Sequence, residues 1–417
     1  MTSFAITNVR VFDGENVLED ADIVVEDGII KQVGHGLNSG HLPSISMPGH
    51  TLLPGLIDAH CHPERELSLL EQAYRFGITT IMDMHNVHEN VVQLKRWAQE
   101  RKDIPDVKSC HYAATIKGGW PAWVEMKLPG VEPTRFEDYP NVNSEKAAEA
   151  YIQKAVEGKY DYIKLMHEDG RALGIGEGQI AKPTAAVQEA IVRAAHKRGL
   201  KVVAHALSLK DTREVLKAGV DGMAHTFFDE PITPEIVELH KRNNVWVNPT
   251  LACAGALTGE SLDIFKQFSE DERVKNKLST GDIELMHHCL HLKAPGAKWE
   301  YAINSVRQLR AAGIDIICGS DAAAGAPGSV FGANLHIEMY LLVTKAGMSA
   351  LEVLRSATSL TADLFGWNDR GRIAGGLKAD LLLVEGNPLS NITDTLNIKG
   401  IWRDGVSFEG HQGFPKY

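Results

Sequence analysis

The sequence predicts an α/β protein: a (β/α)8 barrel with a small β-sandwich domain built from both termini. In the middle of the chain, short apolar stretches of strand length alternate with amphipathic helical stretches, and eight such units can be counted. Both ends differ, because they carry short alternating strands with Asp-Gly turns such as Asp13-Gly14. We therefore expect residues 1–54 and 367–417 to form one composite β-sandwich domain and residues 55–366 to form the barrel.

The eight predicted barrel strands are short and rich in apolar residues. The first ends at His62, and the others cover residues 78–84, 107–115, 160–167, 201–207, 221–227, 245–251 and 314–322. Amphipathic helical patterns such as 183–200 and 209–220 lie between several of them. A doubly wound open sheet is the alternative, but no G-x-G-x-x-G motif follows the first strand.

Two connections are too long to be simple turns. Residues 117–144 follow the third strand, and the mostly helical residues 252–312 separate the seventh strand from the eighth. Long loops at the carboxyl ends of barrel strands usually shape the substrate pocket. We expect both insertions to cap a pocket.

The composition excludes several classes of partner. The formal charge of −11 argues against nucleic acid and anionic membranes. The N-terminus has no signal-peptide pattern, and no stretch approaches the ~18 apolar residues of a membrane span. The five scattered cysteines are typical of reduced thiols. We expect a cytoplasmic homo-oligomer that acts on a small molecule.

The stretch PGLIDAHCH ends a buried strand with His60 and His62. The side-chain period of a strand is two, so both imidazoles point to one face. Two imidazoles on one face can bind a metal ion, although the pair alone is equally consistent with coincidence.

Further polar residues follow other apolar strands at the same end. Lys164 comes from the fourth strand, His205 from the fifth, His225 from the sixth, and Asp321 from the eighth. A lone histidine here is more often a core residue. Four histidines and an aspartate at one rim of a barrel indicate a metal site.

Lys164 is unsuited to this place as an ammonium group, because it would repel a metal ion and is costly to bury. If its amine captures CO2, it becomes an anionic carbamate with two oxygens that can bridge two metals. The alternative is a buried ion pair. We expect a carboxylated Lys164.

These motifs together resemble the amidohydrolase superfamily in its binuclear, carboxylated-lysine form. The similar pieces are PGLIDAHCH, YIKLM, VVAHA, GMAHT and GSDA, followed by a closing segment that contains GRIAGGLKADLLLVEGNPL. The resemblance covers nearly the whole chain. It is strongest to the imidazolonepropionase-like branch, which includes Xaa-Pro dipeptidases and ochratoxinase-like amidases.

The resemblance implies a role for each ligand. His60, His62 and Asp321 would bind one metal, His205 and His225 the second, and carboxylated Lys164 both. Zn²⁺ is the expected metal, although such ligands also suit Mn²⁺, Co²⁺ and Fe²⁺. Many relatives have a TGG turn after the lysine and a second histidine after the fifth-strand ligand. This chain has MHEDGRALG and Leu207 there.

The expected reaction is hydrolysis of a C–N bond, amide or peptide-like, in a small molecule. Hydroxide held between the two metals would attack, with Asp321 as the catalytic acid and base. One alternative is that the same site acts on a lactone, on a cyclic amidine or in decarboxylation of an aromatic acid, and a noncatalytic scaffold is a further alternative. A serine triad is rejected, since no G-x-S-x-G motif occurs.

Four residues are weaker candidates for substrate contacts. Trp120 and Trp123 lie in the third-strand insertion and would line an apolar pocket, or pack that loop onto the barrel. Tyr112 and His167 lie near strand ends, where surface or supporting roles are the alternative.

Overall fold

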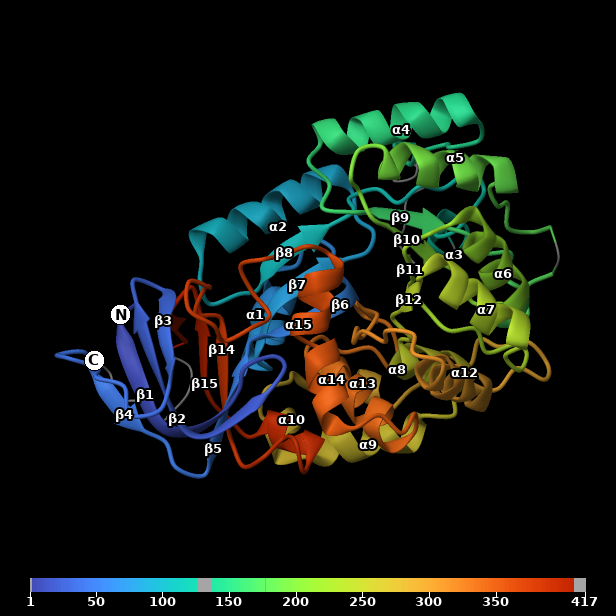
Figure 1. Cartoon of the computed structure of the whole chain (residues 1–417). Helices are drawn as coiled ribbons and strands as arrows, with labels where there is room; N and C mark the ends of the chain where they lie inside the picture. Colours follow the sequence, from blue (N-terminus) through green and yellow to red (C-terminus); the bar gives the residue numbers. More distant parts are fainter. Residues whose placement is uncertain (1, 127–136, 177, 409–417) are drawn as a thin grey trace.

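The computed structural model describes residues 2–126, 137–176 and 178–408 (Figure 1). Part of the predicted insertion 117–144 and the end of the predicted segment 367–417 lie outside the described residues.

Strands from both termini combine into one eight-stranded sheet. They are β1 (Phe4–Phe12), β2 (Val17–Glu26), β3 (Ile29–Gly34), β4 (Ser44–Ser46), β5 (His50–Pro54), β14 (Leu381–Glu385), β15 (Ile398–Arg403) and β16 (Val406–Ser407). The strand order is β16-β15-β14-β5-β1-β2-β3, with β4 also paired to β1. Since β14 pairs antiparallel with β5, the two ends of the chain are joined directly, as predicted.

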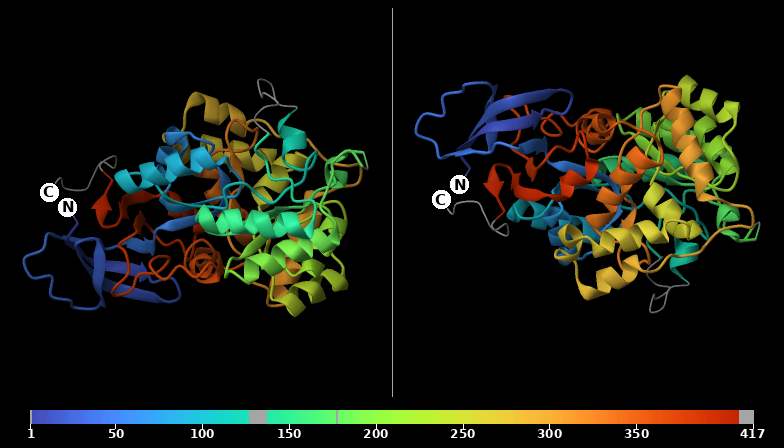
Figure 2. Two further views of the ribbon diagram at one scale, coloured as in Figure 1. Left: turned by 90° about the horizontal axis from the view of Figure 1, so that it is seen from above. Right: turned by 90° about the horizontal axis from the view of Figure 1, so that it is seen from below.

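This sheet encloses a hydrophobic core of its own. Residues of β1, β2 and β3 share that core with residues of β14 and β15. Phe4 of β1 stacks on Trp402 of β15 at a centroid distance of 5.4 Å, although two strands separate β1 from β15 in the sheet. The continuous sheet therefore folds over on itself into two layers. Figure 2 shows it at one end of the molecule, beside the barrel.

Seven barrel strands overlap the predicted ranges and are shorter, whereas the eighth begins only at Ala322, the last residue of the predicted range 314–322. The barrel strands are β6 (Leu56–His62), β7 (Ile78–Asp83), β8 (Asp106–Ser109), β9 (Ile163–Met166), β10 (Val202–His205), β11 (Gly222–Met223), β12 (Trp246–Val247) and β13 (Ala322–Ala323). The third strand ends early because His111 adopts a left-handed backbone with φ of 50°.

Parallel pairing closes these strands into a barrel. One group has the order β13-β6-β7-β8 and the other β12-β11-β10-β9. Ala114 pairs with Leu165 across one gap, and Val247 pairs with Ile316 across the other. The predicted (β/α)8 architecture is confirmed, and β13 carries the eighth segment against the end of β6.

Helices surround the barrel. They are α1 (Leu67–Arg75), α2 (His88–Glu100), α4 (Glu145–Glu157), α5 (Ala185–His196), α6 (Leu209–Ala218), α7 (Pro234–Asn243), α12 (Trp299–Ala311), α13 (Ala333–Thr344), α14 (Ala350–Ser356) and α15 (Ser359–Leu364). Several begin at a hydroxyl residue that accepts a backbone N–H, as Ser144, Thr184 and Ser208 do.

The two predicted insertions contain further helices. Residues 252–312 are mostly helical, as expected, with α8 (Leu251–Thr258), α9 (Leu262–Glu270), α10 (Glu272–Lys275) and α11 (Thr280–Met286) before α12. The third-strand insertion contains α3 (Ala122–Glu125). Short 3-10 helices occupy Arg171–Leu173 and Ile392–Leu396. Within the described residues, we find no helix with the length and apolar character needed to cross a membrane.

Candidate metal centre

The six predicted ligands converge on one cavity at the carboxyl ends of the barrel strands. They come from β6, from β9, from the end of β10, from the residues just after β11 and from the residue before β13. The cavity has a volume of about 290 Å³. All six ligands line it: His60, His62, Lys164, His205, His225 and Asp321, here called the ligand set.

Strand periodicity explains why these side chains face inward. Tyr162 packs in the barrel interior, and Lys164 follows it by two residues. Val203 belongs to the same interior cluster, and His205 follows it by two residues. Since side chains alternate along a strand, Lys164 and His205 each lie one layer above an apolar core residue. The apolar layer forms the base on which the polar cavity rests.

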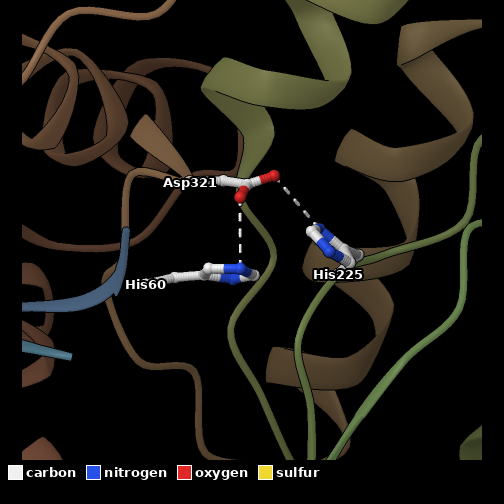
Figure 3. A group of neighbouring side chains, drawn as sticks. All are labelled: His60, His225 and Asp321. Atoms are coloured by element: carbon white, nitrogen blue, oxygen red, sulfur yellow. Dashed lines mark ion pairs between the residues drawn. The ribbon is translucent and has the colours of Figure 1, made fainter. Parts of the chain in front are cut away.

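Asp321 lies between His60 of β6 and His225, which follows β11 (Figure 3). Its Oδ1 is 3.1 Å from Nε2 of His60 and 3.2 Å from Nε2 of His62. Its Oδ2 is 3.8 Å from Nδ1 of His225. One atom each from His60, His225 and Asp321 lies within 4.8 Å of the others, so the three could hold one metal ion.

The backbone of Asp321 is strained. Its φ is 52°, in the left-handed region that residues other than glycine rarely adopt. Its N–H donates to the carbonyl of His60 at 2.7 Å, which holds it against β6. Such strain costs about 1–3 kcal/mol and is typical of functional positions.

The second pair of histidines is close to the first. The ring centroids of His205 and His225 are 4.6 Å apart, and those of His60 and His225 are 4.9 Å apart. Nδ1 of His225 is within 2.8 Å of the hydroxyl of Thr250. On its other side, His205 stacks on Trp120 at 5.3 Å and an interplanar angle of 18°.

Electrostatics favours the protonation states that bind metal. Burial and the Lys164 ammonium lower the pKa of His205 to about 3. The same two causes hold the pKa of His60 well below its ordinary value. Burial opposes ionisation of Asp321, but His60 and His62 beside it hold its pKa below the usual range. Neutral imidazoles and an ionised carboxylate are the forms in which these groups coordinate metals.

Lys164 has a single polar side-chain atom, and that atom is unsatisfied; Nδ1 of His60 and Nε2 of His205 also have no hydrogen-bond partner among the described residues. Lys164 is only 1% exposed, and its Nζ has no hydrogen-bond partner among the described residues. Burial lowers its pKa to about 8, which raises the fraction of neutral, nucleophilic amine near neutral pH. A buried amine without a partner, surrounded by metal-binding groups, fits a site that is completed by metal and CO2.

The four weaker candidates fall in different places. Trp120 lines the cavity. Tyr112 lines a neighbouring cavity of about 550 Å³ instead. Trp123 is not among the described residues that line either one. His167 is buried, and its imidazole faces Glu214 at 2.7 Å from Nε2 to Oε2. Of the four, the structure thus brings only Trp120 to the ligand set.

Other residues of the cavity were not predicted. They are Glu64, His85, Asn86, Pro121, Tyr139, Met166, Ala323, Ala324 and Ala326. His85 follows the end of β7 by two residues, a strand-end position like that of the ligands, and this signal was available in the sequence. Tyr139 contacts His85 edge to face at 5.0 Å. No periodicity marks Tyr139, because it lies in an insertion.

Next to the ligand set lies a second, partly buried cluster of ionisable residues, here called the Lys182 cluster. Its members are His167, Asp169, Lys182, Asp211 and Glu214. Nζ of Lys182 contacts Asp211, lies 3.0 Å from Glu214 and 3.4 Å from Asp169. Its acidic groups are close enough together to hold a metal, but the lysine ammonium already occupies that position.

The chain belongs to the amidohydrolase family, whose model matches residues 51–407. The match includes the whole ligand set and most of the described barrel. The family resemblance that the motifs predicted is therefore confirmed.

Individual relatives are more distant. A 5-methylthioadenosine/S-adenosylhomocysteine deaminase of Pyrococcus furiosus is 28% identical over 152 residues, which is 36% of this chain and 31% of the relative. A dihydroorotase of Caldanaerobacter subterraneus subsp. tengcongensis is 29% identical over 193 residues, 42% of this chain and 43% of the relative. The matches thus span less than half of either relative.

Solved structures match over almost the full length. A Xaa-Pro dipeptidase with bound methionine has a TM-score of 0.77 at 24% identity, covering 98% of this chain and 100% of that one. Ochratoxinase of A. niger has a TM-score of 0.71 at 18% identity, covering 99% and 96%. At these identities the comparison establishes the fold: a barrel with a small sheet domain.

Proposed function

We propose that this protein is a metal-dependent hydrolase that cleaves a C–N bond, amide or peptide-like, in a small molecule. The observation that carries the proposal is the convergence of the ligand set on one cavity, with the amine of Lys164 buried and without a partner among the described residues. Membership of the amidohydrolase family supports it.

We propose that the site holds two divalent ions, with zinc as the first choice. His60, His62 and Asp321 would hold one ion, and His205 and His225 the other. Lys164 would contribute to both as a carbamate. As an ammonium group, Lys164 would repel each ion by about 4 kcal/mol at 4 Å and an effective dielectric of ~20. A carbamate changes that repulsion into attraction.

When bound, such ions lower the pKa of water towards ~7 and polarise a carbonyl. The chain itself supplies the proton transfer. Asp321 is held ionised by the neighbouring histidines, so its carboxylate can accept a proton and return it to a leaving nitrogen. The short contacts of Oδ1 with His60 and His62 fix where that carboxylate points.

The rest of the cavity favours a compact substrate with an apolar part. Trp120, Pro121 and Tyr139 form one part of the wall, and alanines after Asp321 form another. Such surfaces bind through apolar and aromatic contact, while few polar groups fix orientation. A volume of about 290 Å³ suits a small molecule.

The test begins with metal content, measured by atomic emission on purified protein. The zinc-loaded protein is then screened against N-acyl amino acids, Xaa-Pro dipeptides, lactones and aromatic carboxylates. We expect two metal equivalents and turnover of an amide or dipeptide. Turnover confined to lactones or aromatic acids would show that the site acts on a bond other than C–N. Full metal content without turnover of any substrate would count for a noncatalytic scaffold.

A further inference from the structure

Glu168 is a buried carboxylate that lies between the ends of β9 and β10. Its exposure is 1%. Its Oε1 accepts the N–H of Gly170 at 2.7 Å, and its Oε2 accepts the N–H of Leu207 at 3.0 Å. The side chain therefore spans from the loop after one ligand strand to the loop after the next.

The same carboxylate faces the metal ligand His205. Oε2 of Glu168 lies 3.4 Å from Nε2 of His205. This is longer than a formed hydrogen bond, but contacts at catalytic sites commonly tighten when the missing ligand binds. The face of the same imidazole stacks on Trp120. Two neighbours thus restrict the orientation of His205, one across its ring face and one at its edge.

Burial raises the pKa of Glu168 to about 7, although the N–H groups of Gly170 and Leu207 and the charge of Lys182 act in the opposite direction. A buried carboxylate is costly unless a cation compensates it. Nζ of Lys182, nearby in the fold, contacts Asp169, Asp211 and Glu214. A compensating charge for Glu168 would be present if His205 bound a divalent ion, because the ion polarises the imidazole and its remaining N–H.

We propose that Glu168 is a positioning residue for His205, accepting the Nε2–H hydrogen bond and leaving Nδ1 to bind the metal. A carboxylate can only accept, so Nε2 must carry the proton when this bond forms. A neutral imidazole has one N–H, and its other nitrogen is then the ligand atom. The inference rests on the proposed metal-dependent function and adds the residue that selects the coordinating nitrogen.

The local backbone supports this arrangement. Gly170 has a φ of 81°, and a Cβ there would come within 2.7 Å of Ile175. Only glycine adopts this turn conformation without strain, and the turn directs the N–H of Gly170 towards Oε1 of Glu168. The N–H of Asp169 is meanwhile held by Asp211 at 3.0 Å. The loop after β9 is thus built to present Glu168 to His205.

The test compares Glu168→Gln with a matched control, Glu338→Gln. Glu338 is also fully buried and accepts two backbone N–H groups, at 2.9 and 2.7 Å, but among the described residues no histidine contacts its carboxylate. Zinc affinity is measured by competition with a chromophoric chelator. We expect Glu168→Gln to weaken one of two zinc equivalents by ~10–100-fold. The affinity for the other zinc equivalent should stay near the parental value. In Glu338→Gln, the affinities for both zinc equivalents should stay near the parental values.

A second measurement uses the parent protein and needs no variant to fold. In zinc-loaded protein with ¹⁵N-labelled histidine, two-bond ¹H–¹⁵N correlations report which nitrogen of each ring is protonated. We expect the proton of His205 on Nε2. A proton on Nδ1, or parental zinc affinity of Glu168→Gln for both equivalents, would overturn the inference alone. A parent that binds neither zinc nor Mn²⁺, Co²⁺ or Fe²⁺ would overturn the proposed function, and the inference with it.

Discussion

Two polar clusters lie side by side at the rim of the barrel and compensate their charges differently. The Lys182 cluster is closed, because its lysine contacts Asp211, Glu214 and Asp169. In the ligand set, the amine of Lys164 has no hydrogen-bond partner among the described residues, and burial lowers the pKa of His60 and of His205, which favours their neutral forms. Both clusters contain a lysine, histidine and carboxylate, but histidines predominate in the ligand set and carboxylates in the Lys182 cluster. The two lysines differ as well, because Lys182 contacts carboxylates and the Nζ of Lys164 has no hydrogen-bond partner among the described residues.

The largest effect should follow from replacing the lysine of the ligand set. Lys164→Ala is expected to release most bound metal and to abolish nearly all turnover, a greater loss than the ~10–100-fold caused by removing a residue that only supports a ligand. Acetate should restore part of both by filling the gap. Lys164→Arg should fail, since a guanidinium keeps its charge and cannot form a carbamate. Metal content and intact mass check this prediction. A carbamate adds the mass of one CO2, about 44 Da, to an unmodified lysine. Unmodified Lys164 in active, metal-loaded protein would contradict it.

Asp321→Asn should separate metal binding from proton transfer. The amide remains a neutral ligand but cannot accept a proton, so turnover should fall by ~10²–10⁴-fold while metal content changes little. Rate and metal content are measured on the same sample. If the variant keeps more than about a tenth of the parental rate, another group carries out the proton transfer.

Replacing the lysine of the closed cluster should change stability and leave metal binding intact. Lys182→Met leaves Asp211, which is fully buried, without its cation. Breaking a buried pair costs about 3–5 kcal/mol of unfolding free energy, and the partial exposure of Lys182 favours the lower end. Lys201→Met is the control, because that exposed lysine pairs with Asp221 at 3.0 Å and should cost under ~1 kcal/mol. Loss of zinc from Lys182→Met would mean that the two clusters are coupled.

The smallest effect concerns the pH dependence of the closed cluster. Burial opposes ionisation of Glu214, but hydrogen bonds from His167 and Lys182 hold its pKa below the ordinary value. A carboxyl with a lowered folded-state pKa stabilises the fold above its unfolded pKa of ~4.3, and that contribution is lost as pH falls through the folded value. The difference in urea midpoint between the parent and Glu214→Gln should therefore be full at neutral pH and shrink below about pH 4. A difference that does not change with pH would contradict this.

Most of the architecture was predictable, because it depends on local pattern. Apolar runs of strand length, helical periodicity and Asp-Gly turns gave the eight units and the pairing of both termini. The ligand set was predictable for a related reason: the carboxyl ends of parallel barrel strands meet at one rim, so residues far apart in sequence must converge. His85 follows the same rule and could have been found by it.

Tertiary structure decided what local pattern cannot encode. His167 follows Lys164 by three residues, yet its imidazole faces the Lys182 cluster because Glu214 and Gln188 hold it there. Tyr139 and Trp120 reach the cavity from an insertion without periodicity, and Tyr112 lines a different cavity. The sequence by itself determined which strands end in histidine, lysine or aspartate. Sequence periodicity does not record how far apart two distant segments lie in space. Contacts between such segments decide which lysine is paired and which carboxylate faces His205.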